Sequence, residues 1–209
     1  MNRAEVLAEL REVLGDKVAP YAWSDLRLLN FLSLGQDQFC KDTGFFRDSQ
    51  TYKINTVAGT EAYSIPGRVI EILQVRIDGN LLRKFAGDAP AGTSEGTPFA
   101  WRTDDETGLI SFYPTPDAVY QASLRVWRKS KIAFSTSGDL EIPEDFHLAP
   151  VEWAAHLALS DHDRELQDPV KAADHKAKFD RHYVPEGKRA FRRICAGSGL
   201  FSPNPLYLV

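Results

Sequence analysis

The sequence predicts an α+β protein in which an α-helical bundle carries an inserted antiparallel β-module and ends in an extended C-terminal tail. Three observations lead to this fold class. Apolar residues recur at helical spacing toward both ends of the chain, and they alternate with polar residues in its middle. The last residues are mostly apolar but contain Pro203 and Pro205, which neither a helix nor a central strand accommodates.

Two helices are expected before residue 45. The first covers residues 3–14, where Val6, Leu7, Leu10, Val13 and Leu14 recur at i, i+1, i+4, i+7 and i+8 on one face of a helix, and Gly15 is a suitable stop. The second covers about 24–43, with Ser24 as a good N-cap and Gly44 at its end. Its apolar residues run most of the way round, which indicates a central place in the helical core.

The β-module is expected over residues 48–134 as roughly six short antiparallel strands. Its clearest strand is 69–77, where Leu73, Val75 and Ile77 alternate with polar residues. Asp78-Gly79-Asn80 is a hairpin signal. The other strands are expected near 51–57, 62–66, 81–82, 99–102, 109–113 and 122–127, with a loop rich in Gly, Ala, Pro and Ser at 86–98.

Helical composition returns after Pro143. Residues 146–163 are expected to be helical, with Pro150 in the first turn or at a kink. Asp168-Pro169 is a specific start signal for a long polar helix. We expect Val170, Ala173, Ala177 and Phe179 on the inner side of that helix, and an interruption at Val184-Pro185 before a basic helical segment.

The predicted domains follow from these elements. Residues 1–47 and 135–196 form a helical domain, 48–134 form the inserted β-module, and 197–209 form an extended C-terminal arm. The formal net charge of −4 argues against a general nucleic-acid binder, which would be strongly basic. Neither a signal peptide nor an apolar run of about 20 residues is present, so we expect no contact with a membrane.

No catalytic, cofactor or metal site is predicted, and no cofactor is expected. The chain lacks dinucleotide, Walker A and nucleophile-elbow motifs, and Cys40 and Cys195 are too far apart for a CxxC motif. His156 and His162, with Asp161 and Asp163 beside them, are six residues apart and point in different directions. His175 and His182 are two turns apart and are interpreted as exposed or inter-subunit histidines.

An acidic triplet at residues 104–106 is interpreted as a hairpin turn, because the ligand spacing of a calcium loop is missing. A basic face on the last helix is more informative. It is either a solvated face or a surface for an acidic protein or passing DNA, and Phe191 and Ile194 give the same segment a side that can be buried. Its residues are Lys188, Arg189, Arg192 and Arg193.

The C-terminal tail is the most unusual feature of the sequence. Exposed on a monomer, it would favour aggregation, whereas a proline-restricted extended segment loses little entropy when it binds a partner's groove or sheet edge. We therefore expect it to bind a neighbouring subunit or partner protein, and a tail folded back on its own core is the alternative. The residues concerned are Leu200, Phe201, Pro203, Pro205, Leu206, Tyr207, Leu208 and Val209.

A series of local patterns extends over about residues 23–180. It comprises Trp23-Ser-Asp-Leu with Leu29-Asn-Phe-Leu and Gln36-Asp-Gln-Phe-Cys40, Ala62-Tyr-Ser-Ile-Pro66 before residues 69–77, Leu109-Ile-Ser-Phe-Tyr-Pro-Thr-Pro-Asp117 before Arg125-Val-Trp-Arg128, and Glu141-Ile-Pro-Glu-Asp-Phe-His147. In their order and spacing these patterns resemble the phage head-to-tail connector (adaptor) proteins, of the tail tubular protein A type.

The resemblance implies a non-enzymatic virion protein. Such adaptors dock as a ring, commonly a dodecamer, on the portal and join it to a tail or nozzle protein. DNA passes through the ring transiently during ejection. The resemblance also implies a location at the head-tail junction of the virion, with assembly in the host cytoplasm. The alternative is a virion protein whose β-module binds glycans or hydrolyses peptidoglycan, motivated by Phe99, Trp101, Tyr113 and Trp127 and by the turn carboxylates.

Overall fold

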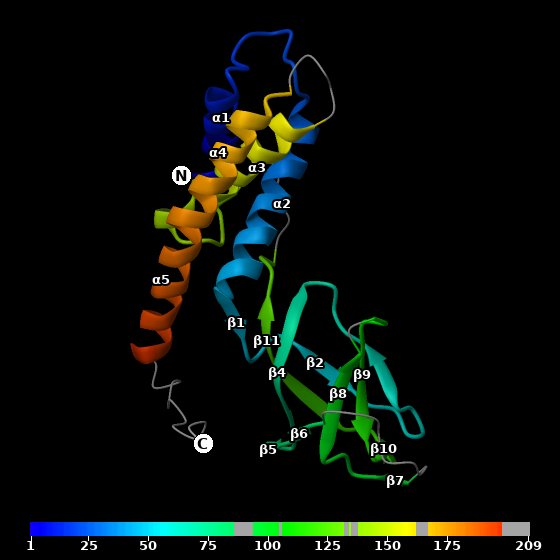
Figure 1. Ribbon diagram of the computed structural model, residues 1–209. Helices are drawn as coiled ribbons and strands as arrows, with labels where there is room; N and C mark the ends of the chain where they lie inside the picture. The colour runs from blue at the N-terminus through cyan, green and yellow to red at the C-terminus, as the bar shows by residue number, and fades with distance from the viewer. Residues whose placement is uncertain (86–93, 105, 132–133, 135–137, 162–166, 198–209) are drawn as a thin grey trace. The chain divides into compact units, whose positions relative to one another are not determined.

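The computed structural model describes the whole chain except residues 86–93, 105, 132–133, 135–137, 162–166 and 198–209, and only the backbone of 194–197. The chain divides into two compact units: a helical unit, Met1–Phe45 with Ser130–Val209, and a β-unit, Phe46–Lys129. Figure 1 shows the helices and strands of each unit. The predicted α+β class is confirmed.

The first two helices begin and end where the sequence predicted. Helix α1 (Arg3–Leu14) starts with a capping box, in which the Asn2 side chain accepts the backbone N–H of Glu5, and it ends at Gly15 in a left-handed conformation. Helix α2 (Asp25–Thr43) starts at the Ser24 cap and ends at Gly44, also left-handed.

A buried carboxylate organises the loop between α1 and α2. Asp16 accepts backbone N–H groups from Ala22 at 2.8 Å and Trp23 at 3.3 Å, and it forms a 2.6 Å ion pair with Arg11. The same guanidinium reaches the exposed Asp25 at 2.5 Å. Buried carboxylates need such partners to offset desolvation, so this network defines the path of the loop.

Helix α3 (Ala149–Ser160) packs against α1 and α2. The predicted helix, 146–163, was longer at both ends: residues 144–146 form a separate 3-10 turn, η1 (Glu144–Phe146), before α3, and Asp161 after it is already extended. Pro150 lies in the first turn of α3, as predicted. The core of the helical unit contains Val6, Leu10, Trp23, Leu28, Leu32, Phe134, Leu140, Val151, Ala154, Ala155 and Ala158.

Helices α2 and α3 approach closely at Gly35. A Cβ atom built on Gly35 would lie 2.6 Å from the carbonyl oxygen and 3.0 Å from the Cα of Pro150. Glycine is therefore required here because the backbone of α3 occupies the space of a side chain.

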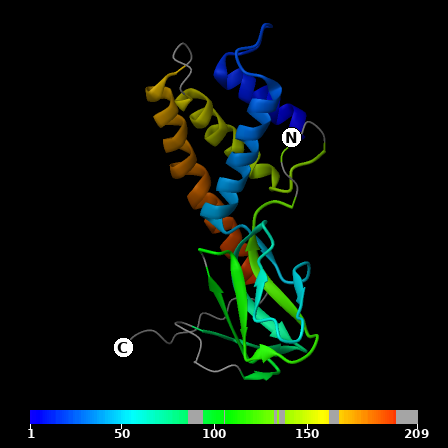
Figure 2. The same cartoon turned by 90° about the vertical axis from the view of Figure 1, so that its right-hand side faces the viewer.

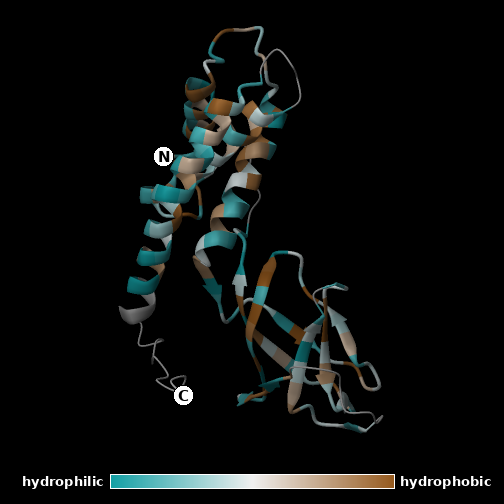
Figure 3. Cartoon of the chain, viewed as in Figure 1, coloured by the Kyte–Doolittle hydropathy of each residue, from teal (hydrophilic) through white to brown (hydrophobic). Residues whose placement is uncertain are grey.

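The apolar sequence of α2 predicted that the core would surround this helix. That prediction was wrong. Leu28 and Leu32 are fully buried, whereas Leu26 is 72% and Leu34 54% exposed. Residues 26 and 34 lie on the side of the helix opposite the buried residues, at 100° per residue. The helix therefore presents exposed leucines to solvent as well as burying others, and apolar residues accordingly appear in brown along α2 in Figure 3.

The last helical segment comprises α4 (Pro169–Lys178), a π-helical turn η2 (Phe179–Tyr183) and α5 (Val184–Gly197). Asp168 caps α4 by accepting the Lys171 N–H at 3.0 Å, as predicted. The interruption predicted at Val184-Pro185 takes the form of this wider turn. Pro185 has no N–H to donate to the preceding turn, and a π turn accommodates the missing bond.

The predicted inner side of α4 was largely wrong. Val170 is 78% exposed, Ala173 is exposed and Ala177 is half-buried, whereas Ala172 and Phe179 are buried. The α3 helix contacts α4 through the side that carries Ala172, His175 and Phe179. Of the expected inner residues, only Phe179 lies on this side.

The β-unit contains two main sheets and a short strand pair. One sheet has the order β1-β11-β4-β5, with β2 also paired to β11; its strands are β1 (Phe46–Asp48), β2 (Lys53–Asn55), β4 (Val69–Ile77), β5 (Asn80–Leu81) and β11 (Gln121–Arg128). The other has the order β3-β9-β8-β6, from β3 (Ala62–Ser64), β9 (Leu109–Tyr113), β8 (Ala100–Asp104) and β6 (Arg83–Lys84). The third is β7 (Glu95–Gly96) with β10 (Thr115–Pro116).

The pairing is antiparallel except for β6 with β8 and β7 with β10, which are parallel. The described residues form more strands than predicted, and several of them are only two or three residues long. Both sheets contribute to one core, which contains Ile54, Ile72, Val75, Ile77, Leu82, Trp101, Ile110, Phe112, Ala122, Leu124 and Val126.

Strand β4 contains an irregularity that its sequence did not reveal. Arg125 pairs with Gln74 but the next residue, Val126, pairs with Ile72, so Leu73 is an extra residue in the ladder. Ile72 is consequently buried, and Leu73, expected to face the core, is only half-buried. The hairpin after β4 is confirmed: Asp78 and Gly79 have φ of 49° and 81°, the positive values that a type I′ turn requires.

Candidate docking surfaces

The basic face of α5 results from how this helix packs on α2. Gly187 points toward α2, and a Cβ there would lie 2.6 Å from Thr43 Cγ2 and about 3 Å from the Phe39 ring. At 100° per residue, the four predicted basic residues lie on the opposite side of α5 from Gly187. All four side chains are exposed: Lys188, Arg189, Arg192 and Arg193. The length of α5 is accordingly drawn mainly teal in Figure 3.

The charge of this face is only partly neutralised within the helix. Arg189 forms a 2.6 Å ion pair with Glu186, and both side chains are more than half exposed, so the pair adds little stability. Within the described part of the chain, no ion pair involves Lys188, Arg192 or Arg193. The face therefore presents net positive charge to a partner.

A groove of about 380 Å³ borders this face on the helical unit. Its lining combines charges of both signs with aromatic rings. Burial, and then the negative charge of nearby Glu152, raise the pKa of Tyr183. The lining residues are Asp145, Phe146, His182, Tyr183, Glu186, Ala190 and Arg193.

Two of the described histidines, His156 and His175, make contacts between α3 and α4. His175 Nδ1 lies 2.6 Å from Glu152 Oε2, and His156 Nδ1 donates to the Ala172 carbonyl at 3.0 Å. Both His175 and His182 were predicted to be exposed or inter-subunit. His182 is exposed, whereas His175 is half-buried between α3 and α4. Among the described residues, no three His, Cys, Asp or Glu side chains are placed to hold a metal ion; His162 and Asp163 lie outside these residues.

Asp104 and Glu106 of the acidic triplet belong to a turn, as predicted. Asp104 Oδ1 accepts the backbone N–H groups of Glu106 and Thr107, and Gly108 has a φ of 67° at the start of the return strand. A hydrogen bond from the Thr107 side chain, and then the one from the Glu106 backbone, lower the pKa of Asp104. Both Asp104 and Glu106 are exposed, and Asp105 lies outside the described residues.

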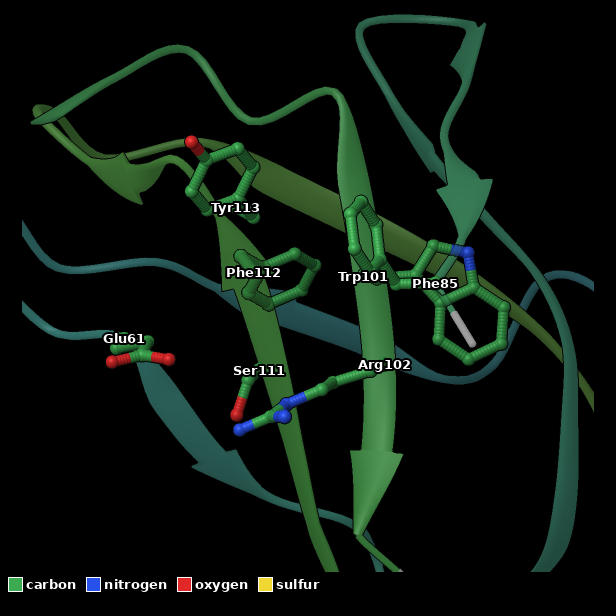
Figure 4. A pocket seen from close by; sticks show the side chains of 7 residues that line it. All are labelled: Glu61, Phe85, Trp101, Arg102, Ser111, Phe112 and Tyr113. Carbon is green, nitrogen blue, oxygen red and sulfur yellow. The ribbon is translucent and has the colours of Figure 1, made fainter. Parts of the chain in front are cut away.

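A small cavity occurs in the β-unit beside β8 and β9, and Figure 4 shows its lining. Its free space of about 10 Å³ holds about one water molecule, far less than a sugar ring needs. Phe99 packs edge-on against Tyr113 at 5.5 Å and is 56% exposed, whereas Trp101 belongs to the core. The residues drawn are Glu61, Phe85, Trp101, Arg102, Ser111, Phe112 and Tyr113.

The predicted tail site falls outside the described residues, which end at 197. This applies to all of its residues: Leu200, Phe201, Pro203, Pro205, Leu206, Tyr207, Leu208 and Val209. The structure therefore brings the basic face and the groove together on the helical unit. Neither the apolar outer face of α2 nor the groove beside the basic face of α5 was predicted from the sequence. The two exposed leucines of α2, Leu26 and Leu34, are eight residues apart, which is a helical spacing.

An α+β chain whose helical unit presents a cationic face and an apolar outer face has the features of a subunit that assembles with other proteins. A family comparison identifies the kind of assembly, because the model of the SU10 adaptor protein matches residues 1–193. The chain belongs to this family of phage adaptor proteins, and the predicted resemblance is confirmed. A search of the curated proteins finds no match.

Membership in this family has three consequences. The chain is a phage structural protein, it is a component of the virion, and it interacts with other head or tail proteins. Within the part of the chain that the structure describes, no helix has both the length and the apolar character needed to cross a bilayer.

Proposed function

We propose that the chain is a head-to-tail connector subunit, which docks as a ring on the portal, joins it to a tail or nozzle protein and leaves a channel for the DNA. The observation that carries this proposal is the match to the adaptor family over residues 1–193, which includes both structural units. Twelve subunits is the copy number we propose. Assembly takes place in the host cytoplasm, and the finished ring is at the head-tail junction.

In this proposal the helical domain, residues 1–47 and 135–196, is a bundle that forms the ring, and the β-module, 48–134, is an insertion in it. The basic face of α5 binds an acidic surface of the portal or of a neighbouring protein. Lys188, Arg192 and Arg193 are exposed and support an electrostatic contact of this kind. Strong binding of DNA by this face would slow its passage, so we assign the face to protein docking.

The C-terminal arm, residues 197–209, is proposed to bind the portal or a neighbouring subunit in an extended form. Its six large apolar side chains supply buried area, and its two prolines reduce the entropy lost on binding. We propose no catalytic role for the chain. The carboxylates of Asp104 and Glu106 are exposed, and Asp104 accepts two backbone N–H groups of the turn itself.

Binding to purified portal rings tests the proposal. We expect the full-length chain to bind, with native mass spectrometry giving twelve copies per portal ring. A variant lacking residues 198–209 is expected to bind at least tenfold more weakly, because a loss of about 1.4 kcal/mol suffices for that factor. Equal binding by the two proteins would refute the role of the arm alone. A full-length chain that binds neither portal rings nor tail protein would refute the connector function.

The exposed Phe99 beside Tyr113 supports a second candidate, a β-module that binds glycans. A glycan array with the full-length chain and a Phe99→Ala variant tests it. Specific binding that disappears in the variant supports glycan recognition, and silence of both proteins contradicts it. A zymogram with peptidoglycan tests hydrolysis in the same way.

A further inference from the structure

We propose that the outer face of α2 in one copy of this chain binds the outer face of α4 in a second copy. The inference rests on the proposed function, because it names the contact through which neighbouring subunits meet in the ring. It also applies to the chain on its own, since both faces are present in every copy.

The α2 face is apolar and bulky. Leu26 and Leu34 are 72% and 54% exposed, and Asn30 between them is uncharged. Spaced four residues apart, these three side chains form a stripe about 12 Å long on the side opposite the buried Leu28 and Leu32. Two exposed leucines on one helix face leave apolar area that a contact can remove from water.

The α4 face is apolar and shallow. Val170 is 78% exposed, and Ala173 and Ala177 continue the same side of the helix over about 10 Å. The acidic and basic residues on either side of this stripe are already paired within α4 and η2. These residues form two i,i+4 ion pairs: Lys178–Asp174 at 3.0 Å and Lys176–Asp180 at 2.7 Å. A neighbour that covers the stripe therefore leaves none of these four charges buried without a partner.

The two faces lie on opposite sides of the helical unit. Helix α3 lies between α4 and α2, and Figure 2 shows it in yellow between the orange and blue helices. Each stripe points away from α3, since the opposite side of its own helix is the buried one. A ring requires two different surfaces on opposite sides of the subunit, because a head-to-tail contact closes by rotation.

The shapes of the faces indicate which surfaces meet. Bulky leucines fit the shallow surface over Ala173 and Ala177 and allow close helix packing. Pairing α2 with α2 would oppose leucine to leucine, and pairing α4 with α4 would bury only small side chains. The two helices also run in the same direction in Figures 1 and 2. Leu26 and Val170 are each the second residue of their helix, so a parallel contact opposes Leu34 to Ala177.

Disulfide cross-linking tests this contact. In a Cys195→Ser background, the double variant Leu34→Cys/Ala177→Cys is expected to give a ladder of covalent multimers when oxidised in assembled phage particles. Each single variant, Leu34→Cys or Ala177→Cys, is expected to give no ladder, because a head-to-tail contact never brings two identical positions together. A dimer from either single variant would instead show a symmetric contact and overturn the inference.

The cross-linking outcome separates this inference from the proposed function. Particles that contain the double variant without a ladder would overturn the contact and leave the connector function standing. If the chain is absent from particles, the connector function is refuted. The proposed contact is then tested by self-association of the purified chain.

For the purified chain at high concentration, Leu34→Asp and Val170→Asp are each expected to abolish self-association, and their equimolar mixture is expected to form dimers and nothing larger. Val119→Asp, at a 73% exposed position of the β-unit, is the matched control and should self-associate like the wild type. If the chain is absent from phage particles, a wild-type chain that sediments as a monomer at every concentration would overturn the proposed contact.

Discussion

The approach of α2 to α3 at Gly35 makes Gly35→Ala a severe test of the helical core. A Cβ at this position would lie 2.6 Å from the Pro150 carbonyl oxygen and 3.2 Å from its carbonyl carbon, whereas ordinary van der Waals contact begins at 3.4 Å. The obstructing atoms are backbone, so no side-chain rotation relieves the clash. The two helices must move apart, and the surrounding core must loosen with them.

The magnitude follows from two opposing effects. Alanine improves the intrinsic stability of a helix by about 1 kcal/mol relative to glycine. Overpacking costs about 1–3 kcal/mol and sometimes more, and a clash with backbone belongs at the upper end. We therefore expect Gly35→Ala to lower the free energy of unfolding by about 2 kcal/mol. Urea denaturation followed by circular dichroism at 222 nm measures this loss, since the helices lie in one unit.

Two other glycines provide graded controls. At Gly187 the nearest atoms belong to the side chains of Thr43 and Phe39, which can adjust, so Gly187→Ala should cost less than Gly35→Ala. No atom lies within 4 Å of a Cβ at Gly67, so Gly67→Ala should leave stability unchanged or raise it by up to about 1 kcal/mol. A Gly35→Ala protein as stable as the wild type would refute the close approach of the two helices.

Three further predictions address the loop network, a helix cap and the basic face. Asp16→Asn should lower the free energy of unfolding by about 3 kcal/mol in denaturant titrations, because Arg11 loses a buried partner; Asp25→Asn, at a 62% exposed carboxylate, should cost less than about 1 kcal/mol. The Lys171 N–H lowers the pKa of Asp168, so this carboxylate stabilises the fold above its unfolded pKa of about 3.9, and the contribution is lost as the pH falls through the folded value. In thermal melts from pH 6 to pH 2, wild type should therefore lose stability relative to Asp168→Asn, which caps without titrating. Arg192→Glu/Arg193→Glu should weaken portal binding by about tenfold at low salt and by less at high salt, measured by interferometry.

Each of these predictions has a distinct contrary outcome. Equal costs for Asp16→Asn and Asp25→Asn would mean that burial of the first carboxylate is energetically unimportant. A constant difference between wild type and Asp168→Asn across the pH range would exclude the proposed titration. For the basic face, Lys53→Glu on the exposed surface of the β-unit is the control, and an equal effect of that change would attribute binding to overall charge.

Local signals in the sequence correctly predicted the structural features that one or two residues determine. The ends of α1 and α2 follow from Gly15 and Gly44, and the hairpin follows from Asp78-Gly79, because these conformations depend on few neighbours. The β4 bulge was not predictable, because the extra residue Leu73 is as apolar as its neighbours and only the pairing with β11 identifies it.

The faces of the later helices were less predictable for a related reason. Val170, Ala173 and Ala177 have the spacing of an inward stripe, but Ala172 and Phe179 contact α3 instead, and helical periodicity cannot distinguish a core from a neighbouring subunit. The basic residues of α5 were predictable as a shared face. Their position opposite Gly187 depends on a close contact with α2 that the sequence does not display.

The pairing of β1 with β11 bears on how such a chain can evolve. Phe46 and Arg128, close to the two ends of the β-unit, are direct partners in the ladder, and antiparallel partners lie about 5 Å apart. A segment with adjacent ends can be gained, lost or exchanged in a single recombination event without distorting the helical unit in which it is inserted. Related phages can thus retain the helical unit while the segment between residues 46 and 129 is replaced as a whole.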